Sequence, residues 1–241
     1  GWRRALQRAG REAQELQALA QSMGSNNEIM PWDWRYYSEK LRAQKYDFNE
    51  AEIKPYLELS RMADAARAVA SRLFRITFEE QKGVEAWHPD VRVFKVLDAC
   101  GVQIALFLSD YFSRPSKRSG AWMSALQSQY RLGKGSMPFI YNVMNFAKAP
   151  EGKPTLLSFD DARTLFHEFG HALHGMLSDV HWPSVSGTSV ARDFVELPSQ
   201  LYEHWLTTPE VLGQYALHYE TGEPMPADML KCMPRSSSAR I

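Results

Sequence analysis

The sequence predicts a mainly α fold that contains one small antiparallel β-sheet. Two observations lead to this fold class. Apolar residues recur every three or four positions in the first part of the chain and again after Pro154, which is the period of an amphipathic helix. Between these parts, residues 91–108 alternate apolar and polar side chains around a turn, as a β-hairpin does.

The N-terminal part is predicted to form three helices. An apolar stripe runs from Trp2 to Met23 and ends at the Gly-Ser-Asn-Asn cluster 24–27. A second helix is expected from Pro31, which suits a first helical position, to about Tyr46. A third is expected from Asn49 to Leu73, because Asn49 and Glu52 form a capping-box-like pair ahead of another apolar stripe.

The sheet is predicted from three short segments. Val91–Leu97 and Val102–Leu108 read as a hairpin around a turn at 98–101. Residues 138–146 read as a third strand, with a proline at its start, where a missing N–H is tolerated. A basic turn at 114–120 lies between the hairpin and the third strand.

Composition excludes several classes of protein. The 241 residues are near the upper size for one hydrophobic core, and 44% hydrophobic with 23% charged residues is an ordinary globular balance. Because 28 basic residues face 28 acidic ones, the chain lacks the broad basic footprint of a nucleic-acid-binding protein. No apolar run approaches the length needed to span a bilayer. We therefore expect neither a nucleic-acid nor a membrane partner.

Two features bear on where the protein resides. Cys100 and Cys232 are too few for a disulfide scaffold or a thiolate zinc site, which favours a reducing compartment and hence the cytoplasm. The chain begins at Gly1 rather than Met and shows no signal peptide, so we expect that the natural N-terminus is missing.

Residues 158–178 carry the most informative pattern. Ser158 can cap a helix, with Asp161 in the capping-box position. One face of this helix must point to a core, because four apolar residues fall within a narrow stripe: Leu165, Phe169, Ala172 and Met176. Three histidines lie on the opposite side: His167, His171 and His174.

His167, Glu168 and His171 form an H-E-x-x-H motif. The two histidines are one helical turn apart, so two imidazoles can converge on one tetrahedral ion. Glu168 lies about 100° around the helix from His167, off the ligand axis but within reach of a metal-activated water. This arrangement makes the glutamate a general base rather than a ligand.

A third ligand is expected from a following helix. The metzincin variant is excluded, because the positions that it requires hold His174 and Leu177. Glu196 follows His167 by 29 residues, which leaves room for a loop and a returning helix, and two His with one Glu form a known open catalytic zinc set. Glu203, two turns further on the same face, is expected either to accept a hydrogen bond from a ligand imidazole or to form a solvated salt bridge.

The motif and its surroundings resemble a known family. HEFGHALHGM, followed by SGTSVARDFVELPSQLYEHW, resembles the thimet oligopeptidase family of zinc metallopeptidases and is most similar to its bacterial peptidyl-dipeptidase (dipeptidyl carboxypeptidase) branch. The resemblance covers the chain to about Leu230 and extends to further segments: 31–42, 86–98, 114–123, 153–175 and 218–230.

The resemblance implies a two-lobed, largely helical oligopeptidase with a zincin-like (gluzincin) catalytic region, in which one zinc ion lies deep in a channel. By motif match, His167, His171 and Glu196 are the zinc ligands and Glu168 is the base. Residues 1–233 would then be a partial catalytic domain followed by a non-matching tail at 234–241. The expected parts of that domain are a helical part at 1–85, a sheet at 86–147 and the zinc-site helices at 155–220.

The implied function is zinc-dependent hydrolysis of short peptides with release of C-terminal dipeptides. The alternative is a truncated, non-catalytic zinc-binding remnant. The strand at 139–146 is expected either to hydrogen-bond a peptide or to be a plain edge strand. Three basic residues either meet a peptide carboxylate or form a solvated turn: Arg114, Lys117 and Arg118.

The same resemblance implies that members of the family continue beyond this chain. Their later part carries a His and a Tyr that stabilise the oxyanion, and no residue after Met233 matches them. We therefore expect the 241-residue chain alone to bind zinc but to hydrolyse peptides poorly.

Overall fold

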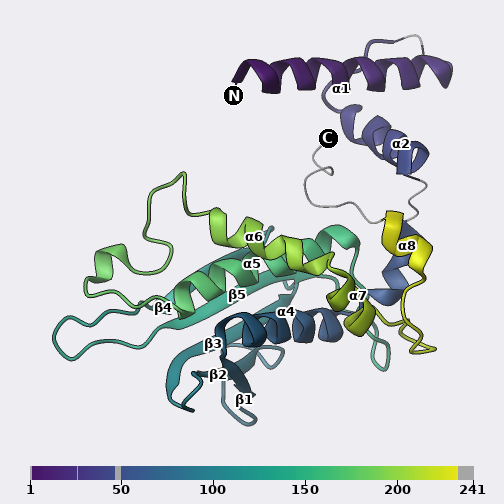
Figure 1. Cartoon of the computed structure of the whole chain (residues 1–241). Coiled ribbons are helices and arrows are strands. Elements are labelled where there is room, and N and C mark those ends of the chain that lie inside the picture. Colours follow the sequence, from purple (N-terminus) through teal and green to yellow (C-terminus); the bar gives the residue numbers. More distant parts are fainter. Residues whose placement is uncertain (1, 26, 47–49, 233–241) are drawn as a thin grey trace. The chain divides into compact units, whose positions relative to one another are not determined.

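The computed structural model describes residues 2–25, 27–46 and 50–232 of the 241-residue chain. The chain divides into two compact units, one made of residues 1–50 with 226–241 and the other made of residues 51–225 (Figure 1). The predicted tail at 234–241 and the predicted helix start at Asn49 lie outside the described residues.

The first unit opens with the long helix α1 (Trp2–Ser22), which confirms the first predicted helix. Its apolar stripe is only partly covered. Leu16 and Ala20 are fully buried, whereas Trp2 and Leu6 at the start of the stripe are exposed.

The second helix, α2 (Trp34–Tyr46), begins at Trp34 rather than at Pro31. The segment before it forms a turn instead, in which the Asp33 carboxylate accepts a hydrogen bond from the backbone N–H of Met30. The short helix α8 (Ala227–Cys232) belongs to the same unit.

The third predicted helix is interrupted. A single turn α3 (Glu50–Ile53) and a 3₁₀ turn η1 (Lys54–Tyr56) precede α4 (Leu59–Phe74). Pro55 lies in the 3₁₀ turn, and Glu58 is extended and forms a β-bridge with Leu156. A proline cannot continue the α-helical hydrogen-bond ladder, which explains the break. Four residues of the predicted apolar stripe of α4 are buried, namely Leu59, Met62, Ala66 and Val69, whereas the fifth, Leu73 near the end of the helix, is 43% exposed.

The predicted hairpin is present as β2 (Arg92–Leu97) and β3 (Gln103–Phe112), which pair antiparallel. The Asp98 carboxylate closes the turn by accepting the backbone N–H groups of Cys100 and Val102. The predicted third strand is β5 (Phe139–Phe146).

The sheet differs from the prediction in size and direction. It has five strands in the order β1-β2-β3-β5-β4, with two strands that the sequence did not predict: β1 (Thr77–Glu80) and β4 (Trp122–Gln127). β5 pairs parallel to β3 and antiparallel to β4, so the sheet is mixed rather than antiparallel. The chain leaves β3, forms β4 at the far edge and returns between the two, which makes β5 run in the same direction as β3.

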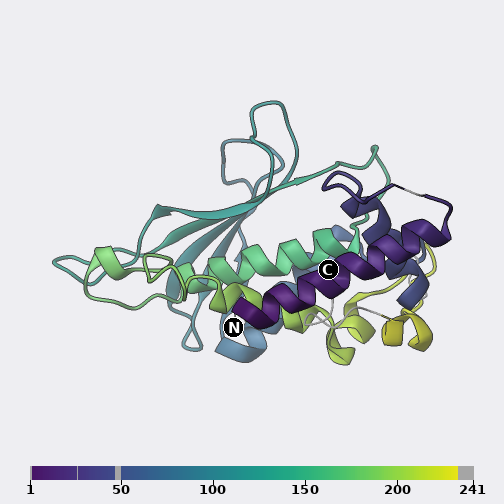
Figure 2. The ribbon, with the colours of Figure 1, turned by 90° about the horizontal axis from the view of Figure 1, so that it is seen from above.

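Helix α5 (Phe159–Met176) lies along one face of this sheet, as Figures 1 and 2 show. The ring of Phe169 meets the ring of Phe107 on β3 edge to face, with 5.3 Å between centroids. All four residues of the predicted apolar stripe are at most 2% exposed, which confirms the predicted phase of this helix.

After α5 the chain forms a loop that contains the 3₁₀ turn η2 (Pro183–Val185), followed by α6 (Leu197–Leu206) and α7 (Pro209–Tyr215). α6 packs against α5, as the sequence predicts for a returning helix. Among the residues that the structure describes, no helix combines the length and the apolar character needed to cross a bilayer.

Candidate metal centre

Helix α5 presents His167 and His171 on one side, and a capping box fixes where this helix begins. The Ser158 hydroxyl accepts the Asp161 N–H at 3.0 Å, and the Asp161 carboxylate accepts the Ser158 N–H at 3.1 Å. This reciprocal pair satisfies two backbone donors of the first turn. The two imidazoles then lie one turn apart, with ring centroids 4.8 Å from each other.

Helix α6 brings Glu196 to the two histidines. Its Oε2 atom lies 3.2 Å from His167 Nε2 and 3.2 Å from His171 Nε2. Zn–N and Zn–O bonds of about 2.0–2.1 Å in a tetrahedron place neighbouring ligand atoms about 3.3 Å apart. The three donor atoms therefore have the identity and spacing that a zinc ion requires, and the half-exposed Glu196 side chain leaves one side of the cluster open.

A glycine between the histidines allows this approach of α6. A Cβ atom on Gly170 would lie 2.7 Å from the Cα of Ser199 and 2.9 Å from the Cβ of Tyr202. Both distances are too short for carbon atoms, so the close contact of the two helices depends on the absence of a side chain at this position. This role of Gly170 was not predicted from the sequence, although a glycine in a helix interior is a recognised sign of close packing.

Two residues of α6 hold Glu196 and its helix in place. The buried Ser199 hydroxyl lies 3.0 Å from Glu196 Oε2 and 2.9 Å from the Glu196 carbonyl oxygen, so its one O–H can donate to either. The Tyr202 hydroxyl donates to the Ala66 carbonyl at 2.7 Å, which ties α6 to α4. Neither contact was predicted from the sequence.

Glu203 contacts a histidine of the cluster, which decides between the two expectations for this residue. Its Oε1 atom lies 2.6 Å from His167 Nδ1. A proton on Nδ1 leaves the lone pair on Nε2, the nitrogen that faces Glu196 and His171. Burial lowers the pKa of His167, but the hydrogen bond to Glu203 and the nearby carboxylates of Glu168, Glu203 and Glu196 raise it above its ordinary value.

Glu168 lies beside the cluster and is only 8% exposed. Burial raises the pKa of its carboxyl group, the charge of His167 partly opposes this rise, and the nearby carboxylate of Glu196 adds to it. A cavity of about 320 Å³ opens at Glu168 and His167, and its other lining residues are Ala121, Arg163, Thr164 and Glu203. A carboxyl group in this position can exchange protons with a molecule bound in the cavity.

His171 and His174 differ in their relation to the cluster. Burial lowers the pKa of both imidazoles, and the charge of His167 lowers that of His171 further. A neutral imidazole is the form that binds a metal ion. The described residues that can together hold an ion are His167, His171 and Glu196, and His174 instead packs its ring against Phe194.

The strand beside the cluster is β4, not the strand at 139–146 that the sequence suggested. Both sides of β5 are paired, one with β3 and the other with β4, so β5 has no edge to offer a peptide. β4 is the edge strand on this side of the sheet. Ala121, directly before β4, lines the cavity at Glu168 and His167, so this end of β4 lies beside the cluster.

Two of the three basic residues predicted as candidates for a peptide carboxylate are engaged elsewhere. The buried Asp110 side chain accepts two hydrogen bonds from Arg114, at 2.7 and 2.6 Å, and lies 2.8 Å from Lys117 Nζ. Arg118 is exposed, and its guanidinium stacks over the ring of Trp122, 4.6 Å from the centroid. The segment 114–120 is therefore neither a carboxylate site for Arg114 and Lys117 nor a fully solvated turn.

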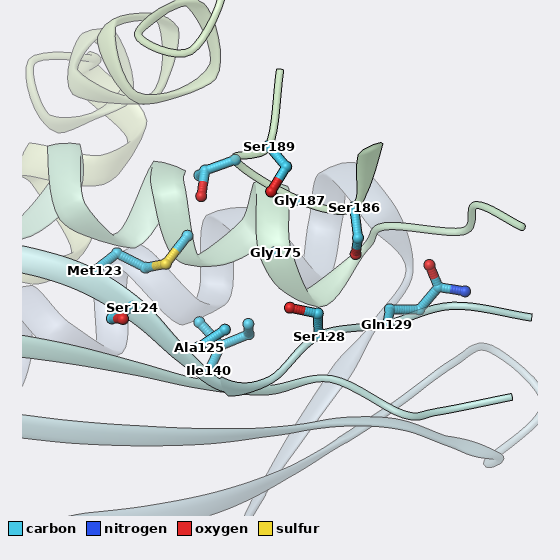
Figure 3. Close-up of a pocket in the computed structure, with 11 residues that line it drawn as sticks. Met123, Ser124, Ala125, Ser128, Gln129, Ile140, Gly175, Ser186, Gly187 and Ser189 are labelled. Carbon is cyan, nitrogen blue, oxygen red and sulfur yellow. The ribbon is translucent and has the colours of Figure 1, made fainter. Parts of the chain in front are cut away.

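A second pocket lies at the other end of α5. It encloses about 230 Å³ between β4, its continuation and the loop after η2. Figure 3 shows Gly175 of α5 between the two sides, with Ser124, Ser128 and Gln129 on one and Ser186 and Ser189 on the other. The Ser178 hydroxyl accepts the Gly187 N–H at 2.9 Å and so fixes the loop against the end of the helix.

Comparison with protein families identifies one match. The family model described as "Peptidase family M3" matches residues 2–240. This range includes both compact units and every residue of the cluster described above.

Curated relatives agree with this match. The chain is 44% identical over 234 residues to a dipeptidyl carboxypeptidase of Escherichia coli and 40% identical over 234 residues to oligopeptidase A of the same organism. It is also 39% identical over 233 residues to an organellar oligopeptidase A of Arabidopsis thaliana. These alignments cover 97%, 96% and 92% of this chain but only 34%, 34% and 30% of the relatives. The chain thus spans about a third of the length of the relatives that it matches.

Proposed function

The chain belongs to peptidase family M3, and on that premise we propose that it is the zinc-site region of a metallopeptidase that hydrolyses short peptides. The observation that carries this proposal is the convergence of two imidazole nitrogens and one carboxylate oxygen beside a buried glutamate. We propose that the region around this site is zincin-like, of the gluzincin type, and belongs to a two-lobed oligopeptidase. The substrate class rests on the relatives, which are named as carboxypeptidases and oligopeptidases.

In this proposal His167, His171 and Glu196 hold one Zn²⁺ ion. When bound, zinc acts as a Lewis acid. It polarises a peptide carbonyl and lowers the pKa of water to near neutrality. Glu203 keeps the proton of His167 on Nδ1 and so maintains Nε2 as the ligand atom. The Ser199 hydroxyl orients the Glu196 carboxylate in the same way.

Glu168 acts as the general base. Its carboxylate takes a proton from the attacking water and then gives it to the leaving amine. The raised pKa of this buried carboxyl group brings it closer to neutrality, where a group can both accept and return a proton efficiently.

The unpaired edge of β4 binds the peptide in an extended conformation. An edge strand offers backbone N–H and C=O groups that are independent of the peptide's sequence. Because Ala121, directly before β4, lines the same cavity as Glu168, a peptide along this edge would pass the general base. The role that we expected for the strand at 139–146 is therefore assigned to Trp122–Gln127.

The reaction that we propose for the whole enzyme is release of dipeptides from free C-termini. A test uses matched peptides with a free or an amidated C-terminus. Amidation is expected to slow hydrolysis strongly if the enzyme removes C-terminal dipeptides. Equal rates on the two peptides would favour internal cleavage instead.

Replacement of Glu168 tests the mechanism. The Glu168→Gln variant keeps all three ligands but cannot accept the water proton, so it is expected to retain one zinc ion and to lose about 10² to 10⁴ in kcat. Near-normal turnover in this variant would remove Glu168 from the mechanism. Loss of zinc from it would make Glu168 a ligand rather than a base.

The alternative is that the 241-residue chain binds zinc without catalysis. Stoichiometric zinc with no turnover of short peptides would establish this alternative for the chain alone. The two cysteines support a cytoplasmic location, which stays part of the proposal.

A further inference from the structure

Two pockets lie at opposite ends of the path that a peptide would follow along β4. The first is lined by Ala121, just before β4, and by Arg163 and Thr164 in the first half of α5. The second is lined by Ser124 and Ser128 on and after β4 and by Gly175 at the end of α5 (Figure 3). The catalytic glutamate borders the first pocket, so a bound peptide would extend from it in both directions.

The two pockets differ in charge. The second pocket is lined by hydroxyl groups, glycines, an amide and apolar side chains, without a charged residue among those that form it. Among the described residues that line either pocket, Arg163 alone carries a permanent positive charge, and the first pocket also contains the carboxyl groups of Glu168 and Glu203. A terminal carboxylate is favoured beside a guanidinium, whereas an uncharged stretch of peptide is favoured among hydroxyls.

From this difference we propose that the first pocket receives the C-terminal residues of the peptide and that Arg163 binds the terminal carboxylate. The inference rests on the peptidase function proposed above and adds the direction of the substrate to it. The C-terminus lies toward Ala121 and the preceding residues lie toward Ser128, which makes the peptide antiparallel to β4.

The position of Arg163 fits a dipeptide leaving group. Arg163 precedes His167 by four residues, which is about 6 Å along the helix axis. Two residues of extended chain span about 7 Å. A guanidinium one turn before the first ligand is therefore at the right distance to bind a carboxylate two residues beyond the bond that is cleaved.

The existing partners of Arg163 leave it able to bind a ligand. Its Nη2 donates to Asp160 Oδ1 at 2.7 Å, but the Asp160 side chain is 73% exposed, and such solvated pairs are weak. Its Nε lies 4.0 Å from Glu203 Oε2, beyond hydrogen-bond distance, and Glu203 is held by His167. A carboxylate that enters the pocket can take two parallel hydrogen bonds from the guanidinium.

Arg118 is the competing candidate, and its location argues against it. Met123 faces α5, because its Cε atom would lie 3.5 Å from a Cβ atom on Gly175. Successive side chains of a strand point to opposite faces, so Trp122 and the Arg118 guanidinium stacked on it lie on the face away from α5.

A binding experiment on the 241-residue chain tests this inference. The dipeptide Gly-Phe and its C-terminal amide are titrated into the chain, with and without zinc, and bound fractions are followed by NMR. The wild type is expected to bind the free acid about 10-fold or more tightly than the amide. The Arg163→Gln variant is expected to lose this preference, Arg163→Lys to recover part of it, and the control Arg118→Gln to keep it.

The zinc content of each variant separates this inference from the proposed function. A wild-type chain with no preference for the acid, or an Arg163→Gln variant that keeps the preference, would overturn the role of Arg163 while leaving the metal site standing. Failure of the wild type to bind zinc would instead overturn the proposed function. Rescue by lysine distinguishes a contact with the ligand from a structural role of Arg163 in α5.

Discussion

Two clusters of ionisable side chains lie on opposite faces of the same sheet, and only one of them has the features of a functional site. On the face away from α5, Asp110 is 1% exposed and accepts hydrogen bonds from Trp87, Arg114 and Lys117. Lys117 also donates to three backbone carbonyls, those of Asp110, Phe112 and Met144. Every charge in this cluster has its partners within the protein.

The cluster on α5 and α6 is not balanced in this way. His167 Nε2, His171 Nε2 and Glu196 Oε2 lie within 4.8 Å of one another, an arrangement in which three ligand atoms can surround one metal ion. Burial and charge alone therefore do not mark a functional site. Whether the donors and acceptors of a cluster already match each other is the more informative property.

The first prediction concerns removal of the Asp110 carboxylate from its cluster with Arg114 and Lys117. The Asp110→Ala variant leaves the buried Lys117 without its counter-charge, so we expect the free energy of unfolding to fall by about 3–5 kcal/mol in urea denaturation. The zinc content of the folded variant should remain one ion per chain. The control is Asp179→Ala, which removes an exposed ion pair with Arg131 and should cost about 0–1 kcal/mol. A cost below 1 kcal/mol for Asp110→Ala would contradict the structural role.

The second prediction concerns acidification, which neutralises the Asp110 carboxylate without changing the sequence. Burial would raise the pKa of Asp110, but the hydrogen bonds from Arg114, Lys117 and Trp87 lower it to about 2. Because this folded-state pKa lies below the unfolded value of about 3.9, the ionised carboxylate stabilises the fold above pH 4. That contribution, about 2.6 kcal/mol, is lost as the pH falls toward 2.

The measurement compares the metal-free wild type with Asp110→Asn by urea denaturation from pH 7 downward. The difference in unfolding free energy between them should narrow as the pH falls below 4. A difference that stays constant over this range would show that ionisation of Asp110 does not stabilise the fold.

The third prediction concerns Glu203, which contacts His167 of the metal cluster. In Glu203→Gln the amide accepts the His167 Nδ1 hydrogen bond more weakly, so zinc affinity should fall by about 10- to 100-fold. Competition with a chromophoric chelator measures the Kd. Glu210→Gln, an exposed glutamate on the neighbouring helix α7, serves as the control and should leave the Kd unchanged. An unchanged Kd for Glu203→Gln would remove Glu203 from the support of the site.

The fourth prediction concerns the spacing between α5 and α6. In Gly170→Ala the new Cβ meets the backbone of Ser199, and overpacking of about 1–3 kcal/mol exceeds the gain of about 1 kcal/mol in helix propensity. We expect a net loss of about 1–2 kcal/mol and weaker zinc binding. Gly213→Ala on α7 has open space around its Cβ and should be neutral or stabilising. Equal stability of the two variants would show that the helices do not need a glycine there.

These two clusters also show what the sequence could reveal. The phase of α5, its capping box and the three convergent residues follow from spacing along one helix and its successor, which local patterns encode. The role of Glu203 was left open, because it depends on how closely α6 approaches α5, and Gly170 sets that approach. The pairing of Asp110 with Lys117 depends on the loop that covers the sheet, which no local pattern encodes.

The sheet was predicted less completely for a similar reason. The hairpin of β2 and β3 is local and was found. β4 was missed because much of it is exposed and it lacks a regular alternation. β5 was expected at the edge of an antiparallel sheet, but the chain crosses from β3 to the far edge before it returns, so β5 lies between β3 and β4. This affects the proposed function, since the edge strand that we propose for peptide binding is Trp122–Gln127 rather than 139–146.

Zinc K-edge absorption spectroscopy on the 241-residue chain, combined with metal analysis, tests the central claim most directly. We predict one zinc ion per chain, bound by two imidazole nitrogens and by oxygen at about 2.0–2.1 Å. The zinc should be lost in His171→Ala and in Glu196→Ala but retained in His174→Ala. Sulfur in the coordination shell, or stoichiometric zinc in the Glu196→Ala protein, would contradict the assignment of this cluster as the metal centre.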